Sequence, residues 1–204
     1  MPPGYMSKLK LHKTLLQLAV ALLFAFIVVA GQEPKQSAPA SEQSWNGRYR
    51  NYEYGYTVMI PSLFVGLSPA SPWPQHGIEI KLTPDGHAAV YTTGYFSSVD
   101  YPSLDAAVDA DVDNLRNRTK DLKIIRRETE RLGKLCAIRV VARYKHASSG
   151  MSFVQETITA TRKSKHPEEE VTYTITLVTP EQRYANDTKI LSAILRSWRL
   201  RPLP

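Results

Sequence analysis

The chain has 204 residues, of which 26 are basic and 19 acidic, so its formal net charge is +7. This length is typical of one domain with a short appendage, and 43% hydrophobic residues is ordinary for a globular protein. The single cysteine, Cys136, excludes an internal disulfide, so the fold must depend on its hydrophobic core. Residues 1–30 hold three lysines and no acid, which leaves 23 basic and 19 acidic residues, or +4, for the remainder. Such a mild excess does not predict a nucleic-acid partner.

The N-terminus has the pattern of an export signal. Three lysines precede an apolar run at residues 15–30, and Val28 and Ala30 have the spacing that a signal peptidase reads. We expect cleavage before Gly31 and export to the periplasm or the extracellular space. The alternative is a helix at 15–30 that is retained as an anchor in the inner membrane, since a spanning helix needs about 17 apolar residues or more. Residues 31–46, rich in Pro, Ser and Gln, predict a flexible linker, and 47–204 predict a single domain.

Alternating apolar residues predict three strands before the first helix. In the first, at 52–60, Tyr52, Tyr54 and Tyr56 are expected to share one face of the strand. Residues 68–77 contain three prolines and predict a loop. Strands at 77–82 and 88–96 are separated by Thr83-Pro84-Asp85-Gly86, a sequence typical of a tight turn, which predicts a hairpin.

The remaining pattern is helix, four strands, helix. Ser103 is a suitable N-cap for a helix at 103–120, and a second helix is expected at 184–198. Four strands are expected between them, at residues 122–131, 135–144, 151–161 and 171–179. Short connections between these strands favour antiparallel pairing. The fold class predicted is α+β: an antiparallel β-sheet of about six to seven strands flanked by two main helices, in an α/β/α sandwich.

Patterns that carry chemistry are absent from the sequence. There is no G-x-S-x-G nucleophile motif and no glycine-rich phosphate loop, and no two histidines have metal-ligand spacing. Cys136 lies in an apolar segment and is expected to be a buried, unreactive residue. We therefore expect no enzyme, cofactor or metal. The alternative is a hydrolase-like site that forms only in three dimensions, for example from His76 or His87 with Asp85.

Two groups of side chains are candidates for binding. Tyrosine and tryptophan favour surfaces that are half apolar and half wet, so an aromatic set in the N-terminal half is a candidate ligand groove, although core packing is the competing interpretation. This aromatic set is Tyr54, Tyr56, Trp73, Tyr91 and Tyr95. Arg139, Arg143 and Lys145 alternate along one strand and predict either a solvated sheet face or a basic surface for an anionic partner, such as lipid head groups or an acidic protein.

The order of these signals resembles the PsbP-like and DcrB-like domain family. The resemblance rests on residues 54–61 (YGYTVMIP), on Ser103-Leu104-Asp105 at the start of the first helix, on Gly133 before a long strand, and on residues 194–198 (ILRSW) at the end of the last helix. It implies an extracytoplasmic, usually non-enzymatic α/β/α sandwich, with no functional residue carried over. The expected function is an exported, non-catalytic binding or accessory protein of the cell envelope, whose partner is a protein or small ligand. An enzyme and a membrane-tethered structural component are the alternatives.

Overall fold

Long antiparallel strands form the centre of the molecule in the computed structural model, which describes residues 42–69, 76–97, 101–146, 149–163 and 170–203. The predicted leader, Trp73 and most of the predicted linker lie outside these residues. Four consecutive strands form a meander: β7 (Lys120–Leu132), β8 (Leu135–Lys145), β9 (Ser152–Lys163) and β10 (Glu170–Pro180). The two-residue turn between β7 and β8 contains Gly133 at φ +62, a backbone conformation that glycine adopts without strain.

The large sheet has eight strands in the order β1-β4-β5-β6-β10-β9-β8-β7, and all neighbours are antiparallel. Its remaining members are β1 (Glu42–Trp45), β4 (Gly66–Pro69), β5 (Gly77–Lys81) and β6 (Ala89–Phe96). The predicted hairpin is confirmed: β5 pairs with β6, and Gly86 at φ +72 donates its N–H to the Thr83 carbonyl in the turn. Because β6 pairs with β10, helix α2 (Leu104–Arg118) must carry the chain across the sheet to the far edge at β7.

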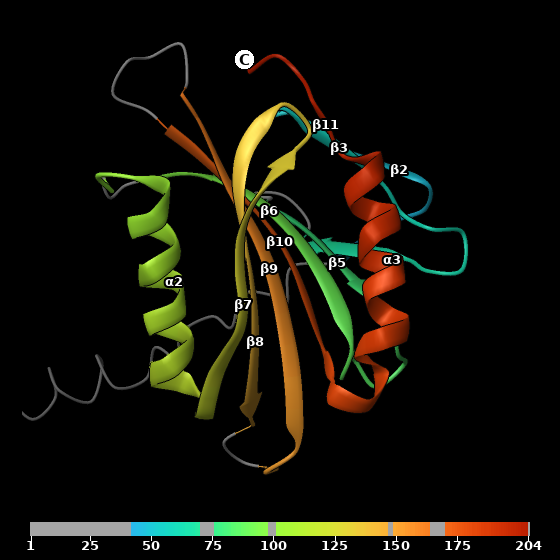
Figure 1. Ribbon diagram of the computed structural model, residues 1–204. Coiled ribbons are helices and arrows are strands. Elements are labelled where there is room, and N and C mark those ends of the chain that lie inside the picture. The colour runs from blue at the N-terminus through green and yellow to red at the C-terminus, as the bar shows by residue number, and fades with distance from the viewer. Residues whose placement is uncertain (1–41, 70–75, 98–100, 147–148, 164–169, 204) are drawn as a thin grey trace, which may run out of the picture. The chain divides into compact units, whose positions relative to one another are not determined.

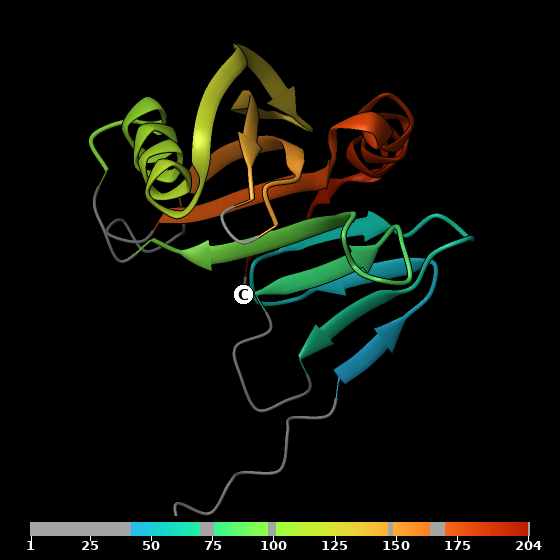
Figure 2. The same ribbon diagram turned by 90° about the horizontal axis from the view of Figure 1, so that it is seen from below.

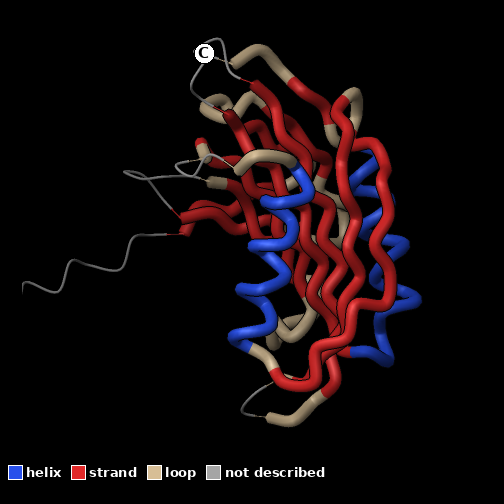
Figure 3. Tube along the Cα trace, turned by 60° about the vertical axis from the view of Figure 1, so that its left-hand side comes forward, coloured by secondary structure: helices blue, strands red, loops and turns tan. Residues whose placement is uncertain are grey.

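A second, three-stranded sheet in the order β11-β3-β2 consists of β2 (Arg48–Asn51), β3 (Tyr56–Met59) and β11 (Arg199–Leu200). It lies beside the C-terminal end of helix α3 (Tyr184–Ser197), which follows a 3₁₀ turn, η1 (Glu181–Arg183) (Figure 1). Figure 2 shows the N-terminal strands on the side of β6 away from α2, and Figure 3 shows the two helices on opposite sides of the strands.

The main core lies between the large sheet and the layer made by α3 and the small sheet. Tyr49, Tyr56, Tyr173 and Trp198 are almost completely buried there, with their rings packed edge-on or stacked. Two smaller apolar clusters connect α2 to the opposite face of the large sheet, through Val108 on one side and Leu115 on the other. Packing on the α2 face is therefore less extensive than on the α3 face.

The α+β class, both helices and the long strands are confirmed, but the strand count is wrong. The four missed strands, β1, β2, β4 and β11, are short, and a four-residue segment offers too little alternation to be recognised. The predicted strand at 52–60 begins only at Tyr56, because Gly55 has φ +61 and Tyr54 N–H donates to Asn51 Oδ1 in a turn. β1 also occupies the last part of the predicted linker.

Candidate functional site

Threonines mark the face of the large sheet that is turned toward α2. They stand at alternate positions in β9 and β10, and the register aligns Thr157 with Thr176 and Thr159 with Thr174 across the two strands. Side chains alternate between the faces of a strand, so the residues between these threonines, such as Ile158 and Ile175, point into the main core. The same two strands thus present an apolar face to α3 and a hydroxyl-rich face to α2.

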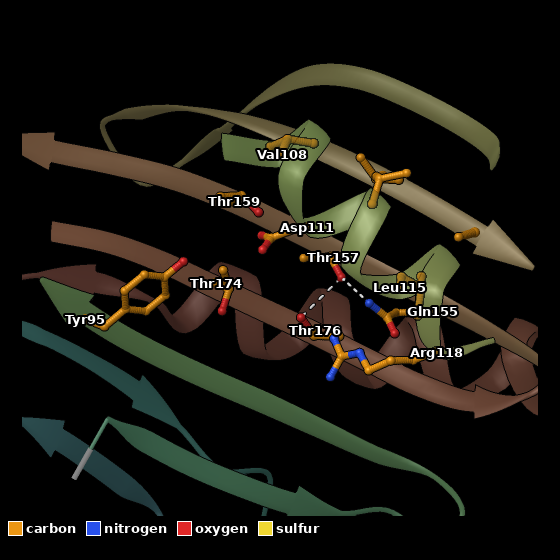
Figure 4. Close-up of a pocket in the computed structure, with 13 residues that line it drawn as sticks. Tyr95, Val108, Asp111, Leu115, Arg118, Gln155, Thr157, Thr159, Thr174 and Thr176 are labelled. Carbon is orange, nitrogen blue, oxygen red and sulfur yellow. Dashed lines mark hydrogen bonds between the residues drawn. The ribbon is translucent and has the colours of Figure 1, made fainter. Parts of the chain in front are cut away.

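A cleft of about 230 Å³ lies between these threonines and α2. Its polar floor is formed by the four threonines and Gln155, and its apolar wall comes from α2 and β8, including Val108, Val112, Leu115, Val140 and Ala142. Figure 4 shows Tyr95 and Arg118 near opposite ends of the group of threonines, with Asp111 between Thr159 and Thr157 in this view. We call this the threonine cleft.

The floor of the cleft is a hydrogen-bonded network of neutral groups. The Thr157 and Thr176 hydroxyls share a hydrogen bond of 3.2 Å, and Gln155 Nε2 donates to Thr157 Oγ1 at 3.2 Å. The Thr174 hydroxyl shares a hydrogen bond with the Thr93 hydroxyl of β6. A hydroxyl can donate one hydrogen bond and accept others, so these groups retain capacity for a ligand without carrying charge.

One acid and one base stand at the cleft. Burial against the protein raises the pKa of the Asp111 carboxyl, and the positive charge of Arg118 lowers it by less. Part of Asp111 remains exposed at the mouth of the cleft, so water screens this effect. Burial, and then the negative charge of Asp111, raises the pKa of Tyr95 to about 12, so the phenol is neutral at pH 7. The cleft therefore holds one acidic and one basic side chain, whose charges oppose each other when both are ionised.

The structure divides the predicted aromatic set between the two sides of the large sheet. Tyr54 and Tyr56 are buried in the main core: the Tyr54 hydroxyl is 3.1 Å from His76 Nδ1, and the Tyr56 hydroxyl donates to the Thr92 carbonyl at 3.1 Å. Tyr91 and Tyr95 lie on the α2 side. Tyr95 lines the threonine cleft, whereas Tyr91 donates from its hydroxyl to Glu79 Oε1 and does not line the cleft. The set does not form a single groove.

Each of the three predicted basic-surface residues has a carboxylate partner. Arg143 pairs with Glu181 at 3.0 Å, and Lys145 pairs with Asp121 at 2.9 Å. Arg139 is largely buried and pairs with Glu130 at 2.7 Å and Glu156 at 2.6 Å. This strand therefore does not present unpaired positive charge.

Glu156 is a fully buried carboxylate on the α3 side of β9. Besides the bond from Arg139, it accepts hydrogen bonds from the Tyr184 hydroxyl at 2.8 Å and from Thr188 Oγ1 at 3.0 Å, both on α3. Because every contact is made by another part of the fold, this network fixes α3 against the sheet and leaves no open position for a substrate. We interpret it as structural.

Of the predicted alternative, His76 or His87 with Asp85, the structure brings together only His87 and Asp85, and both side chains are exposed. His76 precedes β5 and contacts Tyr54, whereas His87 follows β5 and contacts Asp85, so a five-residue strand, roughly 16 Å long, separates the two histidines. In the parts of the chain that the structure describes, no group of three or more His, Cys, Asp and Glu residues is placed to hold a metal. Cys136 is exposed rather than buried, because it stands at the start of β8, beyond the contact of Val108 with Ile138 and Val140.

The threonine cleft was missed in the sequence, although a signal for it was present. Thr157 and Thr159 alternate with apolar residues, and so do Thr174 and Thr176 in the next strand. Alternating threonines also fit an ordinary wet sheet face, and only the packing of α2 converts them into the floor of a cleft.

No known family model matches the chain, and no curated protein matches it by sequence. Solved structures do match. Cyanobacterial PsbP (CyanoP) from Synechocystis superposes with a TM-score of 0.51 at 13% identity, over 84% of this chain and 99% of that one. PA94 from Pseudomonas aeruginosa, a protein of unknown function, gives 0.52 at 14% identity over 72% and 99% of the two chains. The Ran-binding protein Mog1p of Saccharomyces cerevisiae gives 0.50 at 13% identity over 78% and 97%. The chain has a PsbP-like fold, as the resemblance predicted, and similarity at this identity shows the fold alone.

Proposed function

We propose that this chain is an exported, non-catalytic binding protein of the cell envelope, and that it binds a small neutral, hydroxyl-rich molecule of the saccharide class in the threonine cleft. The observation that carries the proposal is the cleft's composition: a neutral hydroxyl and amide floor facing an apolar wall. Sugars match this arrangement, because their hydroxyls need both donors and acceptors while their C–H faces pack on aliphatic side chains.

The charges of the cleft support a neutral ligand. Asp111 and Arg118 offset each other, so a charged ligand would gain one attraction and suffer one repulsion. Non-catalytic function is supported by the cleft's single carboxylate among its described lining residues, since hydrolysis of a glycosidic bond usually needs two.

Export is supported by the lysine-flanked apolar run at 15–30. Neither helix within the described residues has the length and apolar character of a membrane span. Intact-mass measurement of the exported protein tests the export signal separately. A mass equal to that of a chain beginning at Gly31 supports a cleaved leader, and a mass equal to that of a chain that still contains residues 15–30 supports a retained anchor.

The ligand test is two-dimensional amide NMR of the exported protein, titrated with glucose, N-acetylglucosamine and their disaccharides. We expect shifts confined to the elements that line the cleft, which are α2, β8, β9, β10 and the end of β6 at Tyr95. The double variant Thr157→Val/Thr176→Val removes both hydroxyls of a hydrogen-bonded pair and should weaken binding at least tenfold, at a small cost in stability. Thr161→Val is the matched control, since this residue lies on the same face of β9 and does not line the cleft. Shifts elsewhere, or equal losses in both variants, would refute the cleft as the site.

A hydrolase is the second candidate, and Asp111 is the observation that favours it. A carboxyl group with a raised pKa in a cleft is a typical general acid. The same NMR samples can be followed over days for cleavage of the disaccharides. Turnover that is lost in Asp111→Asn would favour the hydrolase over the binding protein.

A further inference from the structure

The outer face of the small sheet carries arginines from two different strands. Thr57 of β3 pairs with Arg50 of β2 on one side and with Arg199 of β11 on the other. Directly paired residues of antiparallel strands point to the same face, so the two arginines flank Thr57, which is only 6% exposed. Arg48 pairs with Met59 two positions further along β3 and therefore lies on this face as well. We call these three residues the arginine face.

Within the described residues, no ion pair involves Arg48, Arg50 or Arg199. Arg199 Nη1 donates to the carbonyls of Arg196 and Trp198 at the end of α3, which neutralises no charge. Glu53, in the turn between β2 and β3, interacts with Tyr54 and His76 instead. The positive charge of this face is therefore uncompensated, in contrast to that of the paired cations on β8.

Exposed apolar side chains lie on the arginine face and in the loop that follows β3. Met59 is 43% exposed on the arginine face itself, and the loop that follows it exposes 89% of Leu63 and 43% of Val65. Aliphatic side chains next to unpaired arginines suit a lipid interface, where guanidinium groups meet phosphates and apolar groups enter the boundary of the acyl chains. A nucleic acid offers phosphates but no comparable environment for Leu63.

We propose that the arginine face, together with Met59, Leu63 and Val65, binds the surface of a membrane that contains anionic lipids. The order of the chain agrees with this placement. Arg48 stands 18 residues after Ala30, so a chain still attached through its apolar segment holds this face within roughly 60 Å of the bilayer even when the linker is fully extended. After cleavage, the same face would keep the domain at the membrane surface.

The test is co-sedimentation of the exported protein with vesicles of phosphatidylcholine alone and with vesicles containing 30% phosphatidylglycerol. We expect binding to require phosphatidylglycerol and to be lost when NaCl is raised from about 0.1 to 1 M, which shortens the Debye length from about 10 to about 3 Å. Each arginine near an anionic surface contributes about a fivefold factor in affinity, so Arg48→Gln/Arg50→Gln should weaken binding about 30-fold.

The matched control is Arg143→Gln/Lys145→Gln, which removes the same charge from cations that have acidic partners. It should lower vesicle binding by less than about threefold. Leu63→Ser should weaken binding severalfold at about 0.1 M NaCl, because it removes apolar rather than charged contact. Equal losses in both charge variants would overturn the proposal, since they would indicate attraction by net charge alone. Equal binding to both kinds of vesicle would also overturn it, and so would a preference for duplex DNA or polyglutamate over vesicles.

Discussion

Replacing Arg139 by Met tests whether the buried network at Glu156 holds α3 on the sheet. The variant keeps the aliphatic bulk of the side chain but removes the guanidinium that donates to Glu156 at 2.6 Å. Glu156 is fully buried, so its carboxylate would keep only two neutral hydroxyl donors, from Tyr184 and Thr188. Removing one partner of a buried ion pair typically costs about 3–5 kcal/mol.

The structure places the expected cost near the lower end of that range. Arg126 Nη2 lies 4.0 Å from Glu156 Oε1 and supplies part of the lost attraction. We therefore expect the free energy of unfolding to fall by about 3 kcal/mol. For a domain of this size, the melting temperature should fall by about 10 °C. Urea denaturation followed by far-ultraviolet circular dichroism measures the change.

Arg143→Met is the matched control, because Arg143 is on the same strand and forms an exposed pair with Glu181. Its cost should be below about 1 kcal/mol. Adding Glu156→Gln to Arg139→Met should restore most of the lost stability, with a coupling of about 2 kcal/mol, since a neutral Gln can still accept from Tyr184 and Thr188. If Arg139→Met cost no more than Arg143→Met, the network would not be important for stability and the reasoning would fail.

Three further predictions concern single residues. Asp111→Asn should raise the free energy of unfolding at neutral pH by less than about 1 kcal/mol. Because folding raises the pKa of the Asp111 carboxyl above 3.8, the wild type should lose stability relative to the variant as the pH rises through that raised pKa. Equal stabilities of the two proteins from pH 3 to pH 7 would contradict this. Gly77→Ala should prevent normal pairing of β5 with β6, because its Cβ would lie 1.6 Å from the Thr92 carbonyl oxygen; unchanged amide-exchange protection in β5 would refute the prediction. Asp187→Ala should cost about 2 kcal/mol by urea denaturation, because it leaves the buried Thr179 hydroxyl without its 2.6 Å acceptor; a cost below about 0.5 kcal/mol would show that the contact is unimportant.

Local patterns in the sequence were sufficient for the two helices and the long strands. Ser103 caps α2 as expected, by accepting a hydrogen bond from the N–H of Ala106. The long strands β8, β9 and β10 follow from alternation over eleven or twelve residues. Such signals arise within one segment, from side-chain periodicity and capping, and they do not depend on what the segment packs against.

Binding surfaces were harder to predict, because they depend on partners from distant segments. Three basic residues alternate along β8 as predicted: Arg139, Arg143 and Lys145. The sequence of β8 does not indicate that carboxylates from other elements pair with them. The arginine face was not predicted, because its residues are distant in the sequence. Arg50 and Arg199 are 149 positions apart and lie on one face only because β2 and β11 pair with the same strand.

By itself, the sequence determined the α+β class, the two helices, the long strands and the apolar N-terminal segment, since each of these is encoded by residues that are neighbours along the chain. Only the tertiary structure decided which side chains share a surface. Strand order, the crossover through α2 and the pairing of β11 with β3 determine which side chains lie close together. These features of the topology depend on how the apolar faces of all the elements are buried together.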